Sequence, residues 1–172
     1  SDPPAPFTGQ VWYNTTSGDL KYFFVDPGSW STGGNLNTAR RAMGSAGIQT
    51  AALAFAGRSP YTNATEAYNG TSWTEVGNFT TVRQGVSGAG TNTAALGFGG
   101  YGPENPQTAK TELWNGTNWT EVNDLNDGRF LQAGAGTSNT ACLAFGGGVP
   151  AVVNTETWNG TNWTEVNNLN TA

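Results

Sequence analysis

The amino-acid sequence predicts an all-β protein built from repeated four-stranded antiparallel units, and three observations support this fold class. Gly, Thr and Asn, which favour turns or strands over helices, make up about 40% of the 172 residues. The motif Trp-Thr-Glu-Val recurs at Trp73, Trp119 and Trp163, at spacings of 46 and 44 residues. Asn-Gly between aromatic-rich runs is typical of β-hairpins, because both residues tolerate the positive φ that tight turns require.

Every repeat carries the same landmarks in the same order. The frame reaches back to Trp30, 43 residues before Trp73, and an Arg lies ten positions after Trp30, Trp73 and Trp119. An apolar strand ending in small residues follows, then Thr-Glu-x-aromatic, an Asn-Gly turn and the next Trp. These structural repeat positions are Arg40, Arg83 and Arg129, the pairs Gly99-Gly100 and Gly146-Gly147, and the aromatic residues Trp30, Trp73, Trp119, Trp163, Tyr68, Trp114 and Trp158.

The landmarks place four short strands in each of three full units, at about 42–77, 85–123 and 131–167. The expected strands are 42–47, 51–57, 64–69 and 72–77 in the first unit, 85–90, 94–100, 110–115 and 118–123 in the second, and 131–136, 140–147, 154–159 and 162–167 in the third.

The N-terminal segment, residues 1–36, is expected to combine a Pro-rich lead with a degenerate partial unit that lacks its first strand. Trp12 lies 18 residues before Trp30, as Phe55 lies 18 before Trp73. The second region, 37–172, holds the full repeats. The sequence ends where the frame predicts another Arg, so we expect it to be part of a longer chain; closure by the partial unit, or assembly of several copies around an axis, are the alternatives.

The order of landmarks resembles the kelch repeat of β-propellers, over about residues 30–172. The period is shorter than the roughly 50 residues of kelch repeats, and Ala56-Gly57 stands where Gly-Gly is expected. WD40 repeats have a similar length, but the sequence contains no Gly-His or Trp-Asp pair. The resemblance implies a kelch-like β-propeller or propeller segment with four-stranded blades, in which the repeat aromatic residues fill the space between blades.

The charged residues that recur in every unit are interpreted as structural. Each repeat Arg is expected to bond nearby backbone or a repeat Glu, the alternative being a ring of Arg that binds an acidic ligand. Paired carboxylates can hydrolyse glycosides, but a catalytic pair has no reason to recur in each unit. The repeated carboxylates are Glu66, Glu112, Glu156, Glu75, Glu121 and Glu165.

Composition excludes several function classes. The chain has no His and one Cys, Cys142, which removes His-based catalysis, His-metal sites and disulfides. We therefore expect no cofactor and no metal, and we interpret Cys142 as a small buried residue. The net charge of −5, with seven scattered cations, argues against nucleic-acid binding. No apolar run is long enough for a membrane-spanning helix, so no membrane insertion is expected.

The loops after the second strand of each unit, 58–64, 101–110 and 148–154, differ among the repeats. Variable loops on a repeated scaffold commonly carry recognition, and Tyr can stack on a sugar while offering a hydroxyl. The candidate binding residues are Arg58, Tyr61, Tyr101, Glu104 and Asn105.

The repeat motif Trp-Asn-Gly-Thr-Asn-Trp-Thr-Glu-Val, together with the N-terminal motif Gly-Gln-Val-Trp-Tyr-Asn at 9–14, resembles the sequences of kelch-like virion proteins of tailed bacteriophages. The resemblance implies a non-enzymatic structural protein of the phage particle, a tail fibre or capsid-associated fibre component involved in host-surface attachment. Its implied partners are other virion proteins, a host-surface glycan or receptor, and further copies of itself. The alternative is a secreted or surface bacterial propeller that binds carbohydrate. An oxidase of the kelch-containing copper type would need His ligands, which this chain lacks.

Overall fold

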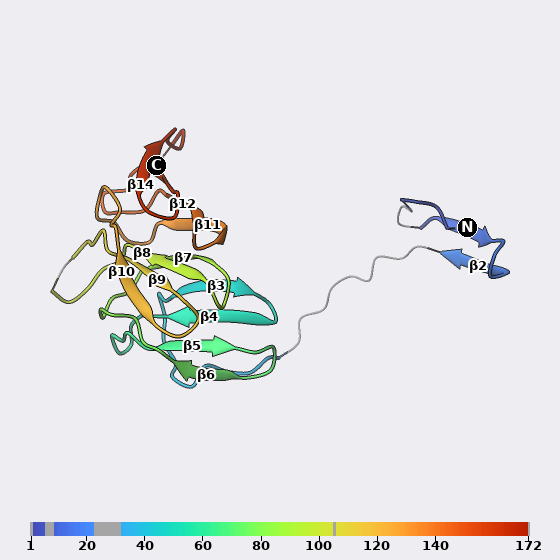
Figure 1. Cartoon of the computed structure of the whole chain (residues 1–172), viewed down its shortest axis with the longest axis horizontal. Helices are drawn as coiled ribbons and strands as arrows, with labels where there is room; N and C mark the ends of the chain where they lie inside the picture. The colour runs from blue at the N-terminus through green and yellow to red at the C-terminus, as the bar shows by residue number, and fades with distance from the viewer. Residues whose placement is uncertain (1, 6–8, 23–31, 105, 172) are drawn as a thin grey trace. The chain divides into compact units, whose positions relative to one another are not determined.

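The computed structural model describes residues 2–5, 9–22, 32–104 and 106–171. The regular secondary structure in these ranges consists of β-strands, with no α-helix. The chain divides into two compact units, Ser1–Thr32 and Gly33–Ala172. Residues 33–36 belong to the second unit, whereas the sequence analysis grouped them with the N-terminal segment. Figure 1 shows both units, which are described separately below.

The N-terminal unit contains a hairpin of β1 (Val11–Asn14) and β2 (Asp19–Tyr22). The Asn14 side-chain oxygen accepts hydrogen bonds from the backbone N–H groups of Thr16 and Ser17 and so stabilises the turn. The Asp2 carboxylate accepts hydrogen bonds from Trp12 Nε1 at 2.9 Å and Asn14 Nδ2 at 2.6 Å. These two bonds hold the pKa of Asp2 below its ordinary value. Residues 23–31 of the expected partial blade, including Trp30, lie outside the described residues.

The second unit consists of three four-stranded antiparallel sheets, each a meander in which every strand pairs with its sequence neighbours. We call them blades 1, 2 and 3. Their strands are β3 (Gly44–Ile48), β4 (Ala51–Phe55), β5 (Thr65–Tyr68) and β6 (Trp73–Val76); β7 (Ser87–Gly90), β8 (Ala95–Phe98), β9 (Thr111–Trp114) and β10 (Trp119–Val122); and β11 (Ala133–Ser138), β12 (Ala141–Phe145), β13 (Thr155–Trp158) and β14 (Trp163–Val166). Each strand overlaps its expected range. The predicted fold class, an all-β propeller segment of four-stranded antiparallel blades, is confirmed.

The first strands of the blades lie side by side, with β7 between β3 and β11. Glycine permits this close approach. A Cβ on Gly88 would lie 2.4 Å from the backbone oxygen of Ser45 in blade 1, and one on Gly134 would lie 2.8 Å from the backbone oxygen of Gly88. Real Cβ atoms essentially never approach within these distances, so small residues on the inner strands set the spacing of the blades.

The hydrophobic core lies between blades rather than within them. Between blades 1 and 2, the Trp119 ring lies 4.7 Å from both the Phe55 and the Phe79 ring, measured between centroids. Between blades 2 and 3, the Trp163 ring lies 5.0 Å from that of Phe98. Each such aromatic residue buries roughly 150–250 Å², so the repeat Trp of one blade supplies much of the apolar contact with the blade before it.

Candidate functional site

Each blade is tied to its entry linker by a buried ion pair between the repeat Arg and the Glu of the third strand. The N···O distances lie between 2.9 and 3.0 Å, and the paired side chains are at most 2% exposed. The second carboxylate oxygen of each Glu accepts a backbone N–H from the residue three positions before the Arg, at 2.7–2.8 Å. The three clasps are Arg40–Glu66 with Asn37, Arg83–Glu112 with Thr80, and Arg129–Glu156 with Asn126.

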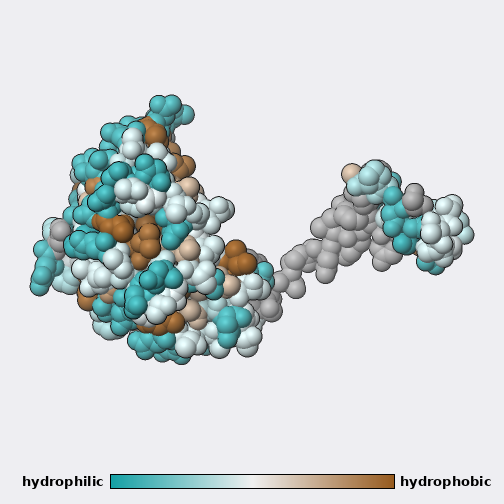
Figure 2. All heavy atoms as spheres, in the orientation of Figure 1, coloured by the Kyte–Doolittle hydropathy of each residue, from teal (hydrophilic) through white to brown (hydrophobic). Residues whose placement is uncertain are grey.

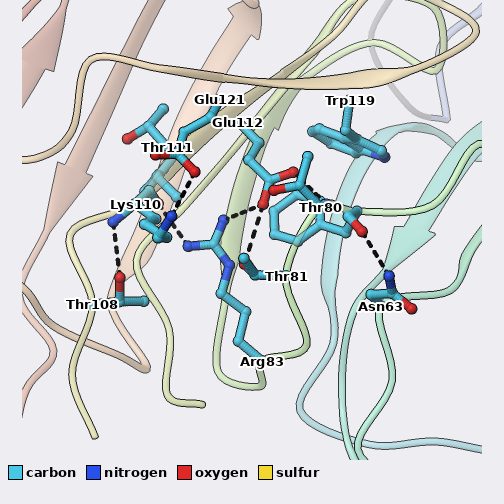
Figure 3. Close-up of polar contacts among 12 residues, drawn as sticks. Asn63, Thr80, Thr81, Arg83, Thr108, Lys110, Thr111, Glu112, Trp119 and Glu121 are labelled. Carbon is cyan, nitrogen blue, oxygen red and sulfur yellow. Dashed lines mark hydrogen bonds and ion pairs between the residues drawn. The ribbon is translucent and has the colours of Figure 1, made fainter. Parts of the chain in front are cut away.

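The clasp of blade 2 is drawn in Figure 3. Arg83 donates to Glu112 Oε1 at 2.9 Å and to the carbonyl of Lys110 at 2.9 Å. The guanidinium carbon also lies 4.5 Å from the centre of the Phe79 ring, within cation–π distance. Burial lowers the pKa of Arg83, and Glu112 opposes that shift. The guanidinium is therefore surrounded by partners of its own chain, and the repeat Arg side chains do not form an open ring.

The variable loop of blade 2 borders a groove. A hollow of about 510 Å³ lies between this loop and the linker that leads to Arg83. Pro103 and Glu104 of the loop line the groove and are exposed. Val82 adds an apolar side chain to the lining, and Lys110 adds a basic one. Lys110 Nζ lies 2.5 Å from Glu121 Oε2 on the neighbouring strand β10. The groove thus presents apolar surface together with charges of both signs.

Blade 3 has a groove at the corresponding place, with a different lining. It measures about 280 Å³ and includes Gln107, Asp127, Val149 and Pro150. Gln107 belongs to the variable loop of blade 2, and its Nε2 donates to the Val149 carbonyl at 3.1 Å. Neighbouring variable loops therefore touch, and the second groove is built from two repeats.

Two of the five candidate binding residues are joined by a residue that the sequence analysis did not single out. Gln84 pairs through its backbone with Tyr101, with both N···O distances at 2.8 Å, and its side-chain amide donates to the hydroxyl of Tyr61 at 3.0 Å. The Tyr101 ring packs on Phe130, 5.4 Å between centroids. Tyr61 is 38% exposed, whereas Tyr101 is half-buried.

The other three candidates are dispersed. Arg58 forms a backbone bridge with Arg41 and is half-buried. Glu104 lines the groove of blade 2, and Asn105 lies outside the described residues. Gln84 and Phe130 could not be recognised from the sequence, because the residue at this repeat position differs from one repeat to the next. The only signal was that each directly follows a repeat Arg, Arg83 or Arg129.

Cys142 is buried and free, and burial raises the pKa of its thiol to about 12. No cluster of three or more His, Cys, Asp or Glu that could hold a metal occurs among the described residues. The described part of the chain also contains no helix long and apolar enough to cross a membrane. No protein-family model and no curated protein matches this chain.

Proposed function

We propose that this chain is a non-enzymatic binding module of a bacteriophage particle, in a tail fibre or capsid-associated fibre, whose variable-loop grooves contact the host surface. One observation carries the binding role. The grooves of blades 2 and 3 occupy the same place on the same scaffold, but their linings differ. The clasps and the aromatic contacts repeat, so variation is concentrated where a ligand could reach.

The arrangement of the carboxylates supports a non-enzymatic role. Glycosidases use a pair of carboxylates, and Glu112 and Glu121 lie directly opposite each other on β9 and β10. Glu112 is enclosed by Arg83 and the linker N–H, and Glu121 pairs with Lys110. Since the same register recurs in blades 1 and 3, these acids serve the scaffold.

The proposal that the chain is part of a phage particle rests on the resemblance of its repeat motif to kelch-like virion proteins. Other virion proteins and a host-surface glycan or receptor are the partners that this proposal names. Mass spectrometry of the particles or secretions that contain the chain distinguishes a virion protein from a secreted carbohydrate-binding propeller. Co-purifying capsid or tail proteins support the virion role, and their absence from a secreted fraction that contains the chain contradicts it.

Binding through the grooves is tested with the purified chain on an array of bacterial surface polysaccharides and on intact bacteria. The double variant Val82→Ser, Glu104→Ala should reduce binding at least tenfold, because it removes one apolar side chain and one carboxylate from the groove of blade 2. Val11→Ser is the matched control, since Val11 is 59% exposed in the N-terminal unit. Equal binding by the double variant and the original chain would contradict the assignment of the grooves.

A further inference from the structure

Each blade turns from its third to its fourth strand through the same Asn-Gly pair. All three Asn residues are exposed, and Asn115 of blade 2 is exposed although blades 1 and 3 lie on either side of it. The visible face of the second unit is largely hydrophilic (Figure 2). Water therefore reaches the turns, which are Asn69-Gly70-Thr71-Ser72, Asn115-Gly116-Thr117-Asn118 and Asn159-Gly160-Thr161-Asn162.

An exposed Asn-Gly pair can deamidate without an enzyme. The backbone nitrogen of the Gly attacks Cγ of the Asn side chain and closes a succinimide ring, and the side-chain amide nitrogen leaves as ammonia with the proton that the Gly nitrogen loses. Water then opens the ring at either carbonyl and gives Asp or isoaspartate. Gly favours the attack because it has no side chain that hinders the approach. Because the Gly and the Thr after it are the same in all three turns, any difference in rate between the turns must come from structure.

The turn conformation opposes this reaction in every blade. The Oδ1 atom of each Asn accepts the backbone N–H groups of the residues two and three positions later, at 2.8–3.0 Å. These are the bonds of an Asx turn. The side chain must give them up before its Cγ can reach the Gly nitrogen. The rate in the folded chain therefore depends on how easily each turn opens.

The turns of blades 1 and 2 are faced by a glycine. The residue four positions after a repeat Trp lies against the turn of the next blade, and it is Gly34 for blade 1 and Gly77 for blade 2. A Cβ on Gly34 would lie 2.4 Å from the Thr71 carbonyl oxygen, and one on Gly77 would lie 2.2 Å from that of Thr117. A glycine fits this close contact but has no side chain that could hydrogen-bond the turn.

The turn of blade 3 is faced by an asparagine instead. Asn123 stands at the repeat position of Gly77, and its Nδ2 donates to the Thr161 carbonyl and to Oδ1 of Asn162, both at 2.9 Å. Thr161 and Asn162 are the residues whose N–H groups hold Asn159 Oδ1. Opening this turn therefore breaks the two bonds from Asn123 in addition to those of the Asx turn. We call these two bonds the Asn123 clamp.

Exposure of the attacking group points the same way. Gly116, whose nitrogen would attack Asn115, is exposed, whereas Gly160 is half-buried. Asn115 and Asn159 lie in the same hexapeptide, Trp-Asn-Gly-Thr-Asn-Trp. The two turns therefore differ in their surroundings and not in their local sequence.

We propose that Asn69 and Asn115 are deamidation sites of the folded protein and that the Asn123 clamp protects Asn159. Conversion to Asp adds a negative charge and keeps a side-chain oxygen that can accept the two N–H groups of the turn. Conversion to isoaspartate adds a methylene group to the main chain. At Asn115 that addition falls in a turn packed on Gly77, so isoaspartate there should disturb the junction of blades 1 and 2.

Peptide mapping by mass spectrometry of the purified chain, incubated in mildly alkaline buffer, tests the proposal. In urea the three Asn residues should react at the same rate, because their local sequences match. In the folded chain Asn159 should react about tenfold more slowly than Asn115, the factor expected when two further hydrogen bonds must break. Equal rates at Asn115 and Asn159 in the folded chain would overturn the proposal, as would full protection of Asn69 and Asn115.

Variants of the clamp identify its cause. Asn123→Gly gives blade 3 the residue that blade 2 receives from blade 1, and it should raise the rate at Asn159 to that at Asn115 while leaving Asn115 unchanged. Asn167→Gly, at the same repeat position of blade 3 and exposed, is the matched control and should change no rate. Circular dichroism establishes that the variants are folded; if Asn123→Gly unfolds, Asn123→Asp removes the donor and keeps the shape. An unchanged rate at Asn159 in a folded clamp variant would contradict the role of Asn123.

Discussion

Blades 1 and 2 contain the same repeat residues in different surroundings. Trp73 and Trp119 both begin a Trp-Thr-Glu-Val strand, but Trp119 packs against Phe55 and Phe79 and bonds to Thr65, whereas Trp73 is half-buried against Tyr68 and the Gly34 carbonyl. The difference arises because blade 1 precedes blade 2 and no described blade precedes blade 1. A repeat position therefore fixes local geometry, while the neighbouring blade decides how much stability the residue supplies.

A second difference concerns the small pair that ends the second strand. Gly99 has φ +65°, and a Cβ there would lie 2.1 Å from Gln132 Nε2 and 2.6 Å from the Arg129 carbonyl. The equivalent Ala56 also adopts a positive φ, of 58°. The residue at the place of Gln132 is Val86, which packs with Ala56 in the core cluster. The side chain that the next blade places here therefore limits the room for a methyl group, together with the carbonyl of the repeat Arg.

The largest expected effect separates the two Trp residues. Trp119→Ala should lower the free energy of unfolding by about 3–5 kcal/mol, because it empties the space between blades 1 and 2. Trp73→Ala should cost about 1 kcal/mol, since the ring is partly in water. Urea denaturation followed by circular dichroism measures both. Equal losses would show that the preceding blade does not determine the contribution.

The clasps should be nearly as sensitive. Glu112→Ala leaves Arg83 buried and unpaired, and it should destabilise the chain by about 3–5 kcal/mol. Glu121→Ala, which removes the partner of the more exposed Lys110, should cost at most about 1 kcal/mol. The same denaturation experiment compares them. A small loss for Glu112→Ala would mean that solvent reaches Arg83 when its partner is removed.

The small pair gives the finest comparison. Gly99→Ala should destabilise by about 2–3 kcal/mol, because the added methyl meets Gln132 and the Arg129 carbonyl. Ala56→Gly should change stability by at most about 1 kcal/mol, since relief of the left-handed conformation is offset by greater freedom of the unfolded chain. Testing Gly99→Ala together with Gln132→Val separates the two causes: the part of the loss due to Gln132 should disappear in the double variant, and the part due to the Arg129 carbonyl should remain.

Much of the repeat scaffold could be predicted from sequence, because the same local pattern is written three times. The spacing of Trp-Thr-Glu-Val and the Asn-Gly turns located the strands, and repetition indicated nearby backbone or a repeat Glu as the partners of Arg83. The bond from Gln84 to Tyr61 and the packing of Tyr101 on Phe130 could not be predicted, since they depend on the path of loops that do not repeat. The unequal burial of Trp73 and Trp119 was equally hidden, as their local sequences are the same.

The glycine bond between repeats has a consequence for how such a chain changes length over evolution. Gly57 and Gly100 reach the Arg carbonyl of the next unit through backbone atoms alone, and the accompanying Trp and Thr recur at fixed positions. These contacts need no complementary substitution when one unit follows another, whereas the small residue and the side chain that faces it, Ala56 with Val86 or Gly99 with Gln132, must remain matched. Recombination between the stretches that encode Trp-Asn-Gly-Thr-Asn-Trp at 114–119 and 158–163 would insert or delete a whole unit, and each product would retain these backbone contacts while its exposed loops were shuffled.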